Sequence, residues 1–106
     1  MKVRNIKTEE NFDNMHDIEK AAQLRSDETA KIIMMKLQPG DVVKEHTTPY
    51  NVSFFVHKGE IVMKIGDESQ KVKEGDLIQS PSNIVHSFTN EASQNAQVMV
   101  VKHINS

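Results

Sequence analysis

The chain has 106 residues, of which 37% are hydrophobic and 26% are charged, and this length and composition are those of one folded domain. Its formal net charge is −2, and the basic residues are scattered rather than clustered, which argues against nucleic-acid binding. The absence of cysteine excludes disulfides and thiolate ligands, so a metal would need histidine, carboxylate, amide or water ligands. Because the sequence lacks a membrane-spanning apolar run and a signal-peptide pattern, we expect a cytoplasmic protein without membrane association.

The first 30 residues are predicted to form a terminal strand and an irregular segment, packed on one barrel that spans residues 31–106 within a single domain. Val3 and Ile6 are apolar residues beside a polar segment, a pattern typical of a terminal strand paired with a sheet edge. Residues 9–31 follow neither the helical nor the strand period, so a turn or short helix is expected there.

The rest of the sequence consists of short apolar segments separated by turn residues. Residues 31–37, KIIMMKL, are apolar on both faces and are followed by Gln38-Pro39-Gly40, as expected for a buried strand that ends at a turn. Further strands are predicted in NVSFFVH, EIVMKI, QKVK, DLIQ and AQVMVVKHI. Turn signals at intervals of roughly 7 to 12 residues indicate an all-β sandwich or barrel.

The second half of the chain contains a spaced motif made of Gly75, Pro81, His86 and Asn90. This spacing resembles the second sequence motif of the cupin superfamily, except that Asn83 stands where glycine is usual. Asparagine tolerates the left-handed backbone conformation better than other non-glycine residues do. We therefore expect Asn83 at a turn position with positive φ.

The first cupin motif is present only in part. Gly40 and His46 match its beginning and Gly59 matches its end. Between them, Thr48 stands where a second histidine is usual, and Val52 stands where a glutamate is usual. The sequence thus resembles a small single-domain cupin with a reduced metal site.

This resemblance covers about residues 31–104 and implies an all-β fold, the antiparallel jelly-roll barrel of cupins, after a short irregular or partly helical N-terminal segment. It also implies that His46 and His86 point into the barrel and hold a divalent transition metal such as Fe, Mn, Ni or Zn. Two imidazoles without a carboxylate predict a weakly held ion. The alternatives left open are that the two histidines hydrogen-bond a small ligand, that they hydrogen-bond each other through water, or that they are purely structural.

Four other residues are candidates for ligand binding. The resemblance places Thr48, Tyr50 and Gln79 on segments that border the barrel cavity, where their polar groups can reach a ligand. Phe54 is expected in the apolar cavity wall, because it alternates with residues that face outward. By the same alternation His57 is expected to point away from the cavity. No catalytic residue is assigned.

An apolar outer face is expected as well, because Phe55 alternates away from the cavity and several strands are apolar on both faces. Monomers rarely leave such a face in water, so we expect a homodimer. His103 is predicted to lie at the surface or at that interface.

Two functions remain open. The first is a cupin that binds a small molecule in its barrel, with or without a weakly held divalent metal. The alternative is a metal-dependent enzyme of the dioxygenase, isomerase or lyase type. The sequence favours the binder, because Val52 occupies the glutamate position and leaves no obvious general base.

Overall fold

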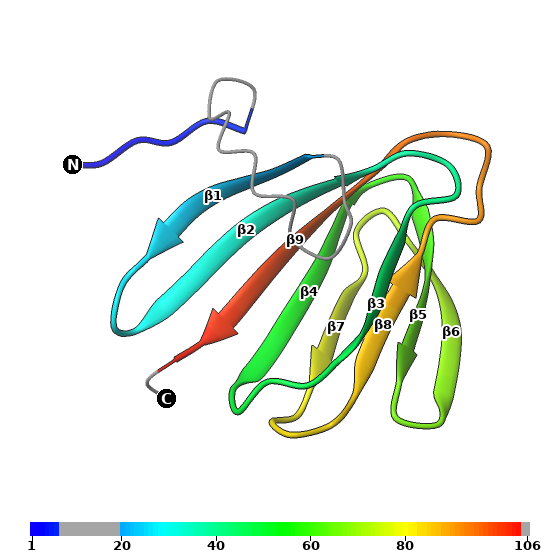
Figure 1. Cartoon of the computed structure of the whole chain (residues 1–106). Coiled ribbons are helices and arrows are strands. Elements are labelled where there is room, and N and C mark those ends of the chain that lie inside the picture. The colour runs from blue at the N-terminus through cyan, green and yellow to red at the C-terminus, as the bar shows by residue number, and fades with distance from the viewer. Residues whose placement is uncertain (7–19, 105–106) are drawn as a thin grey trace.

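The computed structural model describes residues 1–6 and 20–104, which contain nine β-strands (Figure 1). The strands are β1 (Lys20–Ser26), β2 (Ala30–Leu37), β3 (Val42–His46), β4 (Asn51–Lys58), β5 (Glu60–Ile65), β6 (Glu68–Lys73), β7 (Leu77–Ser80), β8 (His86–Thr89) and β9 (Ala96–His103). Within these described ranges there is no helix, and so none that could cross a membrane.

The strands form two antiparallel sheets. The larger sheet has the order β1-β2-β9-β4-β7, and the smaller one has the order β3-β8-β5-β6. β9, the last strand along the sequence, lies between β2 and β4 in the middle of the larger sheet (Figure 1). The inner faces of the two sheets share one apolar core, as in a jelly roll. The predicted all-β barrel is confirmed.

The N-terminal part differs from the sequence prediction. β1 pairs with β2 over Lys20–Ser26, where a turn or short helix is predicted, and a bulge between Gln23 and Arg25 interrupts its register. Such a bulge breaks the two-residue period by which strands are recognised in a sequence. Residues 1–6 are not in a strand, so the predicted terminal strand is wrong there. The remainder of the predicted irregular segment, residues 7–19, lies outside the described residues.

The core follows the alternation of side chains along the central strands. On β4, Val52, Phe54 and Val56 are buried, whereas His57 is exposed, as the sequence predicts. Burying a side chain as large as Phe54 contributes about 2–3 kcal/mol to the free energy of folding. The same cluster contains Ala21, Ile33, Met35, Leu37, Val43, Ile61, Met63, Val72, Phe88, Ala96, Val98 and Val100.

The outer face of the larger sheet carries the other set of side chains. Phe55 pairs with Met99 across β4 and β9, and Met99 pairs with Met34 across β9 and β2, which gives an apolar row on this face. His103 shares the face and lies 3.0 Å from the Ser53 hydroxyl through its Nε2 atom. The homodimer expected from this face stays a prediction.

A buried asparagine connects the end of the second cupin motif to the larger sheet. The Nδ2 group of Asn90 donates hydrogen bonds to the carbonyl oxygens of Leu37, at 3.1 Å, and Gln94, at 2.9 Å. Its Oδ1 atom accepts a hydrogen bond from the backbone N–H of Ala92 at 3.0 Å. Because each such bond contributes about 1 kcal/mol, the side chain fixes the β8–β9 loop on the end of β2.

Asn83 adopts a left-handed conformation, with φ of 64°, as its place in the motif predicts. Its backbone N–H donates a 2.8 Å hydrogen bond to the carbonyl oxygen of Thr48. The turn before β8 is therefore tied to the loop that joins β3 to β4.

We predict that Asn83→Gly is neutral or slightly stabilising, because glycine adopts positive φ without a steric penalty. Asn83→Val should lower the free energy of unfolding by about 1 kcal/mol or more, because a β-branched side chain is strained in this region. Thermal melts of both variants measure the difference. Equal melting temperatures for the valine and glycine variants would contradict the prediction.

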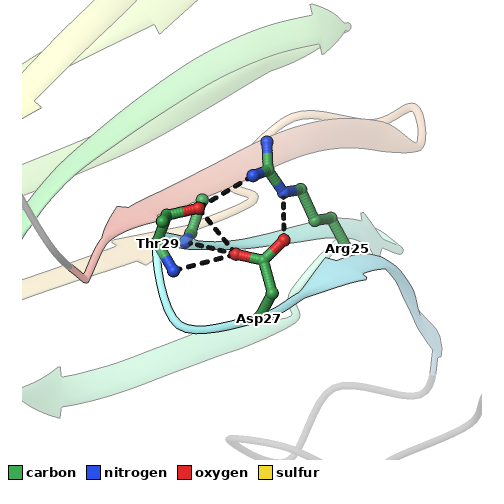
Figure 2. A network of polar contacts seen from close by, with 4 residues as sticks. Arg25, Asp27 and Thr29 are labelled. Atoms are coloured by element: carbon green, nitrogen blue, oxygen red, sulfur yellow. Dashed lines mark hydrogen bonds and ion pairs between the residues drawn. The ribbon is translucent and has the colours of Figure 1, made fainter.

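The β1–β2 hairpin is closed by a polar network around one aspartate (Figure 2). Oδ2 of Asp27 accepts a hydrogen bond from Nε of Arg25 at 2.7 Å. Its Oδ1 atom accepts hydrogen bonds from the hydroxyl of Thr29 at 2.7 Å, from the backbone N–H of Thr29 at 2.8 Å and from that of Ala30 at 3.0 Å. These donors, with Arg25 first, hold the pKa of Asp27 well below its usual range.

We predict that Asp27→Asn lowers the melting temperature at neutral pH, because the ionised carboxylate is the acceptor for all these donors. The pKa of Asp27 is lower in the folded state than in the unfolded state, so its contribution is present above about pH 4 and is lost as the pH falls. The difference in melting temperature between wild type and Asp27→Asn should therefore shrink towards about pH 3.

Asp67→Asn is the matched control, because Asp67 is exposed in another hairpin turn. This variant should melt close to the wild type at both pH values. A difference for Asp27→Asn that stays constant with pH would show that its carboxylate does not stabilise the hairpin through its charge.

Candidate functional site

The two histidines of the cupin motifs meet between the sheets. His46 is the last residue of β3 and His86 is the first residue of β8, and the antiparallel register places them directly opposite each other. Although they are 40 residues apart in the sequence, their Nε2 atoms lie 2.9 Å apart. We call this end of the barrel, marked by His46 and His86, the histidine end.

Their hydrogen bonds define the neutral forms of both rings. Nδ1 of His46 lies 2.9 Å from the carbonyl oxygen of Lys44. Because a carbonyl oxygen only accepts, Nδ1 of a neutral His46 carries the proton and its Nε2 atom carries a lone pair. Nε2–H of His86 then donates to Nε2 of His46. The backbone of β3 therefore orients one imidazole as an acceptor towards the other.

Aromatic rings form the floor beneath this pair. The ring of Phe54 packs edge-on against His86, with centroids 5.2 Å apart, and it packs in the same way against Phe88 at 5.6 Å. His86 is only 3% exposed, whereas His46 is half-buried. The imidazole of His46 is thus the more open of the two. Phe54, which was expected in the cavity wall, is 1% exposed and packs against His86.

The residues at this end fit a weakly held divalent ion better than a tightly held one. Among the described residues there is no group of three or more histidine, cysteine or acidic side chains that could hold a metal. Val52 is buried with its side chain in the core, at the position where the family pattern has a glutamate. His46 and His86 are thus the two protein ligands available here, and neither carries the negative charge that strengthens binding.

The three polar candidates for ligand binding lie in different environments. The hydroxyl of Thr48 donates to the carbonyl oxygen of Tyr50 at 3.1 Å, so it stabilises the β3–β4 loop. Tyr50 is half-buried in the same loop. Gln79 is exposed and pairs with Ser53 on the outer face of the larger sheet, and so it does not join the histidines.

Sequence reasoning missed the polar residues that do face the interior here. Ser80, beside Gln79, is 2% exposed and pairs with Val52 on the inner face. Lys102 follows Val100 by two residues and also pairs with Val52. Strand alternation could have identified both residues, if it had been known which alternate residues of β7 and β9 point into the core.

Comparisons with known proteins agree with this architecture. The cupin domain profile matches residues 33–102 of the chain. None of the curated proteins matches the sequence. A structure described as a predicted oxalate decarboxylase from Thermotoga maritima is 23% identical, with a TM-score of 0.85 over 98% of this chain and 100% of that one.

Two other solved structures have the same fold. A protein from Thermus thermophilus is 23% identical, with a TM-score of 0.80 over 97% of each chain. An RmlC-like cupin family protein with a double-stranded beta-helix fold, from Methanocaldococcus jannaschii, is 25% identical, with a TM-score of 0.74 over 78% of this chain and 77% of that one. At such identities a shared fold does not establish a shared activity. The domain match covers most of the chain and both histidines, and the chain therefore belongs to the cupin family.

Proposed function

We propose that this protein binds a small organic molecule at the histidine end of its barrel, with the imidazoles of His46 and His86 as the polar contacts. The observation that supports the proposal is the 2.9 Å approach of two imidazole nitrogens above an aromatic floor. A few polar groups beside an apolar surface are the usual composition of a small-molecule site.

The histidine pair offers a ligand both hydrogen-bonding roles. If a ligand separates the rings, Nε2 of His46 can accept a hydrogen bond from it and Nε2–H of His86 can donate one to it. This exchange replaces one neutral hydrogen bond by two.

A weakly held divalent metal is part of the same proposal. Two nitrogens that bind one ion at right angles, each at about 2.1 Å, are about 3 Å apart, close to the 2.9 Å between the Nε2 atoms of His46 and His86. Such an ion would polarise an oxygen atom of the ligand. To present its Nε2 lone pair to an ion, His86 would have to carry its proton on Nδ1 instead, so metal binding would be linked to a change of tautomer.

The binding proposal is tested by following the imidazole nitrogens of 15N-histidine-labelled protein by NMR, while a panel of small organic compounds is added in the presence of chelator. Compounds that bind should shift the signals of His46 and His86 together. His46→Ala and His86→Ala should each weaken binding by about tenfold or more, and the double variant should lose little more, because the pair acts as one unit.

His57→Ala is the matched control, because His57 is an exposed histidine on β4 that points away from the core. It should leave the affinities unchanged. If no compound in the panel shifts the signals of His46 and His86, or if binding survives the double substitution, the pair is not a ligand site.

The metal proposal is tested by restoring the family carboxylate with Val52→Glu. Without metal this change should destabilise the fold, because it places a carboxylate in an apolar interior. With Mn(II), Ni(II) or Fe(II) the melting temperature should rise above that in chelator, because a carboxylate then joins two imidazoles. Val52→Gln is the uncharged control and should respond less. If no ion raises the melting temperature of the glutamate variant, the two histidines are not part of a metal site.

A further inference from the structure

The inner face of the larger sheet carries polar side chains at the histidine end, whereas the side chains of the next row are apolar. Lys31 pairs with Lys102 across β2 and β9, Lys102 pairs with Val52 across β9 and β4, and Val52 pairs with Ser80 across β4 and β7. Residues directly opposite each other in antiparallel strands project to the same face. Since Val52 points into the core, Lys31, Lys102 and Ser80 lie on the inner face in one row with it. We call these four residues the mouth row.

The next row of the same face is entirely apolar. It contains Ile33, Val100, Phe54 and Ile78, which are in register across the same four strands. Phe54 packs against His86, so the mouth row lies at the histidine end of the barrel. The histidine end thus combines a buried apolar row and two lysines of the larger sheet with two imidazoles of the smaller sheet.

The two lysines bring positive charge that the described residues do not neutralise. No carboxylate among residues 1–6 and 20–104 lies within ion-pair distance of the ammonium group of Lys31 or Lys102. Burial, and then the charge of Lys31, lower the pKa of Lys102. Both effects disfavour the charged form of Lys102, and a bound anion would offset them.

Ser80 provides a second, independent indication. Its hydroxyl is buried and makes no hydrogen bond within the described part of the chain. Buried hydroxyls in folded proteins nearly always have a partner, so this one has an unused donor next to Val52. Two ammonium groups and a hydroxyl make the mouth row rich in donors, and a group rich in acceptors is its chemical complement.

We propose that the ligand of the site proposed above is a small organic oxyanion, a carboxylate or phosphate ester, whose charged group binds Lys31, Lys102 and the hydroxyl of Ser80. This inference rests on the proposed function and adds the chemical class of the ligand. Another polar group of the molecule reaches the imidazole pair.

The test compares probes that differ in charge but little in shape: benzoate, phenyl phosphate and the uncharged benzamide. Binding to the chelator-treated protein is measured by calorimetry and by the imidazole signals, in a low-salt buffer without phosphate. At least one anion should bind about tenfold more tightly than benzamide. Comparison of benzoate with phenyl phosphate identifies the preferred oxyanion. If neither anion is preferred to benzamide, the proposal is wrong.

Substitutions test which side chains bind the charged group of the ligand. Lys102→Met and Lys31→Met should each reduce the preference for the anion several-fold, and Lys102→Arg should keep most of it, because arginine retains the charge. Ser80→Ala should weaken anion binding without lowering the melting temperature, since it removes an unsatisfied buried hydroxyl. Lys58→Met, at the far end of β4, is the control and should change nothing. Unaltered preference in both lysine-to-methionine variants would overturn the assignment.

Failure of this inference is distinguishable from failure of the proposed function. If benzamide and the anions shift the signals of His46 and His86 equally, the site stands and its charge preference is wrong. If the anions bind through Lys31 and Lys102 without shifting those signals, the mouth row is an anion site of its own, and the histidine pair is not the polar contact.

Discussion

The double pairing of β9, with β2 on one side and β4 on the other, is the constraint on which the rest of this structure depends. It determines which residues of β2, β9 and β4 lie side by side on the inner face of the larger sheet. Because of this register, Lys31, Lys102 and Val52 lie side by side in the mouth row. A slip by one residue would turn every core side chain of β9 towards the outer face, so burial of Val98 and Val100 holds the register and the mouth row together.

In the smaller sheet the same kind of pairing brings His46 against His86. The smaller sheet therefore contributes two imidazoles to the histidine end and the larger sheet contributes two lysines, while Val52 occupies the position of the family carboxylate. Exchanging that carboxylate for an apolar side chain removes negative charge from the interior. The loss of that negative charge beside Lys31 and Lys102 is one reason for proposing an anionic ligand rather than a tightly bound cation.

The all-β fold could be predicted because glycine turns and apolar runs mark six of the nine described strands, although β3 and β8 were not among the strands predicted. Asn83 could be placed at positive φ from the motif spacing. The meeting of His46 and His86 followed only from the family resemblance, since nothing local joins them. β1 was missed because its bulge breaks the two-residue period. β7 has only four residues, too few to show from the sequence which of them point inward. Gln79 was therefore expected at the cavity, whereas it is Ser80 that faces the interior.

The central position of β9 also has a kinetic consequence. The β1–β2 hairpin and the β4–β7 pair have no backbone ladder between them, so neither can join the other until residues 96–103 are in place. Pairing of β2 with β9 closes a long loop, which is a slow step in folding. Before that step, β2 and β4 each expose an unpaired hydrophobic edge, and the chain is most vulnerable to aggregation during that interval.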